Sequence, residues 1–154
     1  MMATWFSVRV MYDRQNANGE WTKAKEVYLI DAVSFTEAEA RAIGEVSPYV
    51  GKGGSLKVTA MKMEDVTEVY NTTIENADKW YRVKMMFESL TDSGKVKKTP
   101  QVVVVKGAST EDATKRLHEG MKGFLADYKI HTVSETSFVD VFFYDLAKVD
   151  DETR

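Results

Sequence analysis

Hydrophobic and polar residues alternate along two stretches of the chain, 4–12 (TWFSVRVMY) and 79–87 (KWYRVKMMF). Alternation with a period of two is typical of a β-strand that buries one face. The unusual feature is the second face of each strand, which carries a tryptophan, cations and a methionine on the side expected to meet water. These second-face residues are Trp5, Ser7, Arg9 and Met11 in the first stretch, and Trp80, Arg82, Lys84 and Met86 in the second.

The two stretches belong to an internal duplication. Sliding the sequence by 75 residues aligns it with itself without a gap and gives twelve identities spread over the whole repeat. The identical pairs are Trp5/Trp80, Val8/Val83, Met11/Met86, Gly19/Gly94, Lys23/Lys98, Val27/Val102, Ser34/Ser109, Ala38/Ala113, Arg41/Arg116, Val58/Val133, Asp65/Asp140 and Val66/Val141. Self-similarity at a fixed spacing indicates a repeated structural unit. We therefore predict one repeat over 1–74, a second over 75–147 and a flexible acidic tail over 148–154.

Each repeat predicts the same series of elements. The first strand runs into an Asn-Gly or Ser-Gly turn, and a second strand follows at 25–32 or 100–107. A helix then begins at Ser34 or Ser109, each with an acidic residue three positions later in capping-box spacing. Further strands are expected near 56–63 and 66–70 in the first copy, and near 130–136 and 139–144 in the second.

These elements predict an α+β fold, built as a tandem duplication of a ββαβ(β) unit with antiparallel sheets and one helix per repeat. A unit of about 75 residues buries little surface by itself. We therefore expect the two repeats to form one compact unit, either packed in a pseudo-twofold arrangement or with their sheets paired edge to edge.

Three segments carry a resemblance to a known family: 5–10, 28–40 (YLIDAVSFTEAEA) and 119–128 (EGMKGFLADY), with 133–136 (VSET) fitting as well. Together they resemble an uncharacterised family, a domain of unknown function, from Bacteroides-type bacteria, their phages and mobile elements. The resemblance covers nearly the whole chain. It implies an intracellular protein of phage or mobile-element background, and it supplies no catalytic residues.

Composition narrows the class of protein. The chain is 44% hydrophobic and 29% charged, as globular proteins are, and its formal net charge is −3. A negative net charge argues against binding duplex DNA mainly through bulk positive charge. The absence of cysteine excludes disulfides, thiolate zinc sites and a cysteine nucleophile. Since the chain has neither an apolar run of about 20 residues nor a signal-peptide pattern, we expect a cytoplasmic protein without membrane contact.

Candidates for catalysis are few. The histidines, His118 and His131, fall opposite Ile43 and Leu56 in the gapless alignment, which favours ordinary histidines over metal ligands. His131 is the single general-base candidate. The Gly-rich stretch 51–54 follows a helix and does not lead into one, so it does not present a helix N-terminus to phosphate. We therefore predict no enzymatic activity, no cofactor and no metal site.

Binding candidates lie on the second faces of the strands and near the hairpin tips. They are Trp5, Arg9, Trp80, Arg82 and Lys84 on the strands, and Lys23, Lys95, Lys97 and Lys98 at the hairpins. Tryptophans beside cations resemble the stacking surface used for single-stranded nucleic acid. However, the second strand of each repeat is apolar on both faces, which usually means that both faces are covered. That pattern favours a packing role for the tryptophans, between repeats or between subunits.

The sequence therefore predicts a non-enzymatic accessory binding protein that contacts single-stranded nucleic acid. Two alternatives remain open. One is an inhibitor or scaffold that binds a host protein and acts as a symmetric homo-oligomer. The other is a sponge for a small nucleotide ligand.

Overall fold

The computed structural model describes residues 4–124 and 126–144, and the chain divides into two compact units. Unit 1 comprises the chain up to Glu64 together with the segment from Ser137, and unit 2 comprises Asp65–Thr136. The acidic tail predicted over 148–154 lies outside the described residues. Unit 1 contains β1 (Thr4–Gln15), β2 (Trp21–Ala32), α1 (Phe35–Val46), the short 3-10 helix η1 (Ser47–Tyr49), β3 (Leu56–Glu64) and β8 (Phe138–Phe142). Unit 2 contains β4 (Glu68–Tyr70), β5 (Lys79–Leu90), β6 (Val96–Gly107), α2 (Thr110–Gly120) and β7 (Asp127–Glu135).

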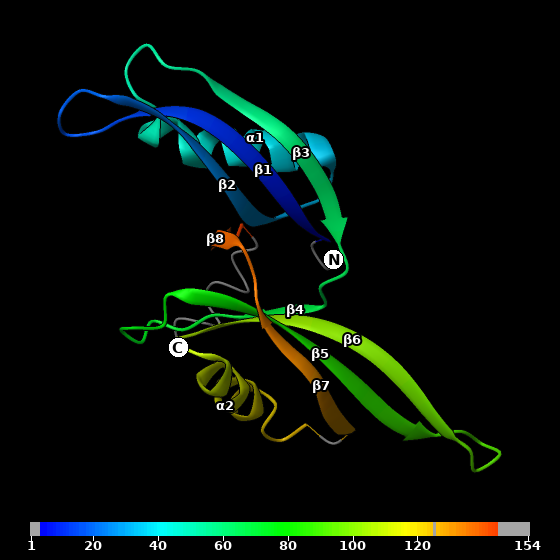
Figure 1. Ribbon diagram of the computed structural model, residues 1–154. Helices are drawn as coiled ribbons and strands as arrows, with labels where there is room; N and C mark the ends of the chain where they lie inside the picture. Colours follow the sequence, from blue (N-terminus) through cyan, green and yellow to red (C-terminus); the bar gives the residue numbers. More distant parts are fainter. Residues whose placement is uncertain (1–3, 125, 145–154) are drawn as a thin grey trace. The chain divides into compact units, whose positions relative to one another are not determined.

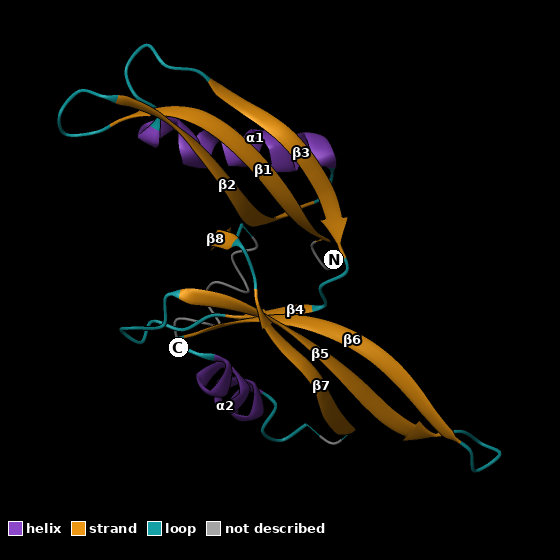
Figure 2. Cartoon of the chain, in the orientation of Figure 1, coloured by secondary structure: helices purple, strands orange, loops and turns teal. Residues whose placement is uncertain are grey.

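Each unit is a four-stranded sheet with one helix on one of its faces (Figure 1, Figure 2). The strand order is β3-β1-β2-β8 in unit 1 and β4-β6-β5-β7 in unit 2, so the two sheets have the same topology read from opposite edges. The predicted α+β class and the two similar units are confirmed. The prediction of antiparallel sheets is wrong for one pair in each unit, because β8 runs parallel to β2 and β4 runs parallel to β6.

The fourth strand of each sheet comes from the other sequence repeat. In unit 1, Val141 of β8 lies beside Leu29 of β2, and in unit 2, Val69 of β4 lies beside Val104 of β6. The sequence repeats and the compact units therefore differ by the exchange of one strand.

Chain connectivity explains this exchange. The place beside β2 requires a strand parallel to β2, and therefore parallel to β3 of the same sheet. To form a second strand parallel to β3 in the same sheet, the chain must first return to the end at which β3 began. Such a crossover takes about a dozen residues or more. Only residues 65–67 separate β3 from β4, and only 136–137 separate β7 from β8. These links are too short for the return, so each short strand joins the other sheet.

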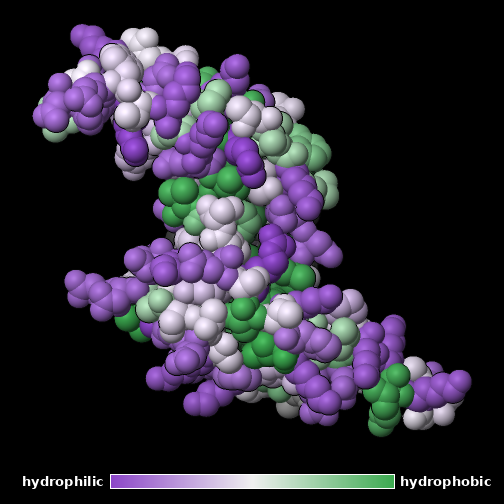
Figure 3. Space-filling model, viewed as in Figure 1, coloured by the Kyte–Doolittle hydropathy of each residue, from purple (hydrophilic) through white to green (hydrophobic). Residues whose placement is uncertain are grey.

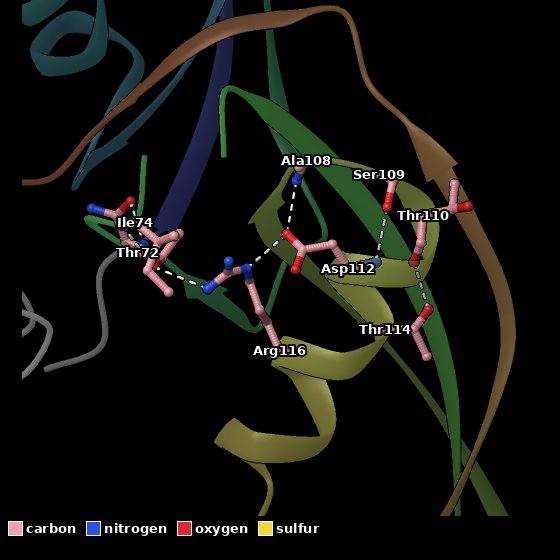
Figure 4. A network of polar contacts seen from close by, with 9 residues as sticks. Thr72, Ile74, Ala108, Ser109, Thr110, Asp112, Thr114 and Arg116 are labelled. Atoms are coloured by element: carbon pink, nitrogen blue, oxygen red, sulfur yellow. Dashed lines mark hydrogen bonds and ion pairs between the residues drawn. The ribbon is translucent and has the colours of Figure 1, made fainter. Parts of the chain in front are cut away.

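An arginine of each helix contacts the segment that follows the exchanged strand. In unit 2, Arg116 Nη1 donates to the Thr72 hydroxyl at 3.2 Å, and Thr72 follows β4 (Figure 4). Asp112 orients the guanidinium, since its Oδ2 accepts from Arg116 Nε at 2.8 Å and from the Ala108 amide at 2.8 Å. The Ser109 hydroxyl accepts from the Asp112 amide at 3.1 Å, as the capping-box spacing predicts.

The strand registers correct the alignment of the two repeats beyond the helix. Val10 pairs with Val58, whereas the equivalent residue Met85 pairs with Ile130. Val58 therefore corresponds to Ile130 and not to Val133, which is an offset of 72 and not 75. The connection between helix and third strand is three residues shorter in the second repeat. The gapless alignment holds through the helices, and the identities at 58, 65 and 66 do not reflect equivalent positions.

The helix side of each sheet holds a hydrophobic core. Alternate residues of the strands point toward the helix, and the apolar stripe of the helix packs against them to form one core. In unit 1, its buried members include Phe6, Val8, Val10, Tyr28, Ile30, Ala38, Ala42 and Val46. In unit 2, they include Tyr81, Val83, Met85, Val103, Val105, Ala113 and Leu117.

Candidate functional site

The face of each sheet opposite its helix, called here the helix-free face, carries the tryptophans predicted to stack bases. Trp5 is 1% exposed and Trp80 is 2% exposed. The Trp5 ring meets Phe143 edge-on, with ring centroids 5.4 Å apart, and Lys106 Nζ lies 5.4 Å from the centroid of the Trp80 ring. Base stacking needs a ring open to solvent. In this structure, the cations of the helix-free faces are therefore the part of the predicted site that can meet a ligand.

A β-bulge lies at the same point of both helix-free faces. The pairing of β1 with β3 shifts register between Arg9 and Val10, and the pairing of β5 with β7 shifts between the equivalent residues Lys84 and Met85. A bulge inserts an extra residue and changes the direction of nearby side chains, and bulges are frequent beside functional sites. The repeat therefore places a cation, Arg9 or Lys84, next to a local distortion of the sheet in each unit.

The extra residue of the bulge is Thr59 in unit 1 and His131 in unit 2. The Thr59 hydroxyl donates to the Arg9 carbonyl oxygen at 3.3 Å. The corrected offset makes His131 the counterpart of Thr59, so the sequence comparison of His131 with Leu56 is wrong. Both side chains are exposed.

In unit 1, the bulge opens a pocket of about 260 Å³, called here the bulge pocket. It is lined by Arg9, Val10, Met11, Lys25 and Thr59. Two cations and a hydroxyl line it without a carboxylate, so the pocket favours an anionic group such as a phosphate. The methionine side chain adds a polarisable surface suited to an aromatic ring.

The counterpart in unit 2 is less cationic. Lys84 and Met86 replace Arg9 and Met11, but Pro100 stands where unit 1 has Lys25. The exposed histidine at 131 adds a group that can hydrogen-bond an anion. The two bulge sites therefore share a cation and a methionine and differ in the strength of their positive charge.

Two further exposed lysines extend the cationic surface of unit 1. Lys57 pairs with Met11, and Lys62 pairs with Ser7, so both lie on the helix-free face. In unit 2, Lys129 pairs with Met86, but its Nζ also lies 3.6 Å from a carboxylate oxygen of Glu88. The sequence pattern missed these lysines, and Lys25 as a pocket residue, because alternation shows which face a residue is on but not which strand lies beside it.

The predicted hairpin lysines are exposed but do not converge with the bulge sites. Lys23 Nζ lies 2.9 Å from Asp13 Oδ1, so this lysine already has an acidic partner. Lys95, Lys97 and Lys98 are exposed around the β5–β6 turn. Arg82 is half-buried on the helix-free face of β5. Hydrophilic side chains also cover the outer end of the β1–β2 hairpin in the view of Figure 3.

Groups that could support catalysis or hold a metal are sparse in the described ranges. His118 Nδ1 lies 2.8 Å from the Tyr128 hydroxyl, and His131 stands at the bulge. Among residues 4–124 and 126–144, no three His, Asp or Glu side chains are placed to hold a metal ion together. Over the same residues, no helix is long and apolar enough to cross a membrane.

Comparison with known proteins places the chain in a family whose function has not been assigned. Among curated proteins, none matches this chain. The model of one protein family, described as "Domain of unknown function (DUF4494)", matches residues 4–144. This span includes every described strand and helix of both units. The chain therefore belongs to the DUF4494 family.

Proposed function

We propose that this protein is a non-enzymatic binding protein that holds single-stranded nucleic acid against the cationic helix-free faces of its sheets. The observation that carries the proposal is the repeated bulge site, which presents Arg9 in one unit and Lys84 in the other beside a methionine. In the setting implied by the sequence resemblance, it is a cytoplasmic accessory protein of a phage or mobile element.

Phosphate contacts supply most of the affinity in this proposal. Arg9 and Lys25 form the bulge pocket, and the exposed residues Lys57 and Lys62 extend the track along β3. Because the tryptophans are buried, Met11 and Met86 provide the surface that meets the bases. The net charge of −3 leaves little long-range attraction, so binding depends on these local clusters and weakens steeply with salt.

Fluorescence anisotropy with labelled single-stranded DNA and RNA, at about 50 mM and about 200 mM salt, tests the proposal. The double variant R9A/K84A should lower the affinity and reduce the slope of log K against log salt by roughly 2, one for each phosphate contact removed. The matched control is K115A/K122A, which removes two exposed lysines of α2 and the turn that follows it. Undetectable binding of both probes at low salt, or an equal loss in the control, would contradict the proposal.

One observation favours a second candidate function. β3 and β7 are edge strands, so each sheet ends in a strand of nine residues with a neighbour on one side in the described structure. Edge strands can pair with a strand of another protein. This arrangement supports a scaffold or inhibitor that acts as a symmetric homo-oligomer. Light scattering that gives a dimer or larger assembly, together with no nucleic-acid binding at low salt, would favour it over the first proposal.

A further inference from the structure

A second pocket, of about 290 Å³, opens on the helix side of unit 1 and is called here the tyrosine pocket. Four aromatic rings contribute to its lining: Tyr12, Tyr28, Tyr49 and Phe142. Tyr28 and Phe142 are stacked, with ring centroids 5.2 Å apart and an interplanar angle of 24°. Tyr12 and Tyr28 are 3% and 5% exposed, so the surrounding core holds them in place, whereas Tyr49 is 64% exposed. The pocket thus combines fixed aromatic walls with one ring at the surface.

Three carboxylates line the same pocket, and each comes from a different element. They are Glu26 of β2, Glu45 of α1 and Asp140 of β8, against the single cation Arg14. Glu26 Oε1 accepts a hydrogen bond from the Tyr28 hydroxyl at 2.7 Å. The lining therefore carries excess negative charge, with at least one carboxylate held by a tyrosine hydroxyl.

The tyrosine hydroxyls remain protonated while they hold these carboxylates. Burial is the main cause that raises the pKa of Tyr28, and the hydrogen bond to Glu26 raises it further. Tyr144, which follows β8, donates to Glu45 in the same way, and burial followed by that bond raises its pKa. At neutral pH both hydroxyls therefore keep the proton with which they orient Glu26 and Glu45.

We propose that the tyrosine pocket binds an organic cation, an alkylammonium or guanidinium group. The exposed ring of Tyr49 attracts such a cation through the ring quadrupole, and the carboxylates of the same lining compensate its charge. No three acidic side chains are close enough together to hold a metal ion within the described residues. A larger cation with diffuse charge, which reaches from the Tyr49 ring to the carboxylates, fits this lining better than a compact ion does.

Unit 2 lacks the equivalent pocket chemistry. Its counterparts of Glu26 and Tyr28 are Gln101 and Val103, and its counterpart of Glu45 is Gly120. The Tyr70 ring packs at Gly120, where an added Cβ would lie 2.8 Å from Tyr70 Cε1. The same fold thus fills this space with a tyrosine in one unit and leaves a charged pocket in the other. The tyrosine pocket is a feature of unit 1, independent of the proposed nucleic-acid surface.

Isothermal titration calorimetry and amide NMR on the full chain test this inference with two probes, spermidine and a short peptide that contains one arginine. The double variant E26Q/D140N removes two charges and keeps amide oxygens in place as acceptors. We expect it to weaken binding about tenfold or more, whereas E68Q, at the counterpart of Asp140 in β4, should leave affinity unchanged. Tyr49→Ala should weaken binding several-fold, and Tyr49→Phe should retain it.

The two probes distinguish the possible sources of the organic cation. Binding of spermidine alone indicates a free polyamine as the ligand, and binding of the peptide alone indicates a basic side chain. Shifts confined to amides around Tyr12, Tyr28 and Phe142 support the site. The inference is overturned if neither probe binds at millimolar concentration, or if E26Q/D140N and E68Q bind equally while both variants retain the thermal stability of the parent. Nucleic-acid binding is a separate readout, so failure here leaves the proposed function intact.

Discussion

Arg116 and Thr72 are 44 positions apart in the chain, yet the guanidinium of Arg116 donates to the Thr72 hydroxyl at 3.2 Å. Arg41, its counterpart in the first repeat, lies with its guanidinium carbon 4.3 Å from the centroid of the Tyr144 ring. Thr72 follows β4 and Tyr144 follows β8. The repeated arginine therefore holds a segment that comes from the other sequence repeat.

Replacing Arg116 should loosen the end of β4. Arg116→Ala removes a hydrogen bond to a charged group and leaves Asp112 without its guanidinium partner, which should cost about 1–2 kcal/mol. Hydrogen exchange measured by mass spectrometry should show faster exchange in peptides that cover 67–74. Arg41→Ala should produce the same change at 138–144, and the exposed residue Lys122, which lies in the turn after α2, supplies a control through Lys122→Ala. Unchanged exchange at both exchanged segments would show that the arginines do not hold them.

Because the fourth strands are exchanged, a substitution in one sequence repeat should destabilise the unit built mainly from the other repeat. Phe142 stacks on Tyr28 of unit 1, so Phe142→Ala should destabilise unit 1 by about 2 kcal/mol although it lies in the second repeat. Exchange should rise in β1 and β2 and remain unchanged in β5 and β6. Tyr70→Ala, at the matched position in β4, should give the reverse pattern in unit 2. If each variant weakened only its own sequence repeat, the exchanged topology would be wrong.

Two helical glycines should respond oppositely to alanine. An added Cβ at Gly44 meets nothing within 4 Å, so Gly44→Ala should stabilise α1 by about 0.5–1 kcal/mol through helix propensity. At Gly120, the new methyl group would push the Tyr70 ring away from its contact with Met121, where the hydroxyl lies 3.4 Å from the sulfur. Gly120→Ala should therefore destabilise unit 2 by about 1–2 kcal/mol. Urea denaturation followed by circular dichroism measures both changes, and a gain in both variants would refute the packing at Gly120.

Protonation of Asp13 should lower the free energy of unfolding of the protein at acidic pH. Its Oδ2 accepts from the Ser55 amide at 2.9 Å and its Oδ1 lies 2.9 Å from Lys23 Nζ. The bond from the Ser55 amide, and then the bond from Lys23, lower the pKa of Asp13 to about 2. Because this folded-state pKa lies below the unfolded value of about 3.9, Asp13 stabilises the protein above about pH 4. That contribution is lost as the pH falls from about 4 to about 2.

Thermal unfolding of the parent and Asp13→Asn across this pH range measures the effect. The difference in stability between them should be largest above pH 4, fall steeply toward pH 2 and become smallest below the folded-state pKa. In Ser55→Ala, which keeps the backbone amide, carboxyl NMR should give an Asp13 pKa only slightly above that of the parent. A difference between the parent and Asp13→Asn that stays constant down to pH 2 would show that Asp13 is not the titrating group.

The local structure of this protein can be predicted from its amino-acid sequence. Period-two alternation predicts the strands, and Ser34 and Ser109 mark the helix starts that the hydrogen bonds to Glu37 and Asp112 confirm. The identities through Arg41/Arg116 reveal the duplication. These features are readable because each depends on residues a few positions apart, whose geometry is set by backbone periodicity and capping.

Which strands lie side by side at the sheet edges depends on contacts between distant segments. A short apolar strand such as β8 fits beside β2 or β6 equally well by pattern, and the short link after β7 selects the other sheet. The long-range pairing of β1 with β3 brings Thr59 to Arg9 in the bulge pocket, and that of β2 with β8 brings Asp140 to Tyr28 in the tyrosine pocket. Trp5 and Trp80 are buried in the folded protein, although alternation placed both on a face expected to meet water. Alternation indicates the face of a side chain, but its neighbours depend on contacts between distant segments, which local sequence does not encode.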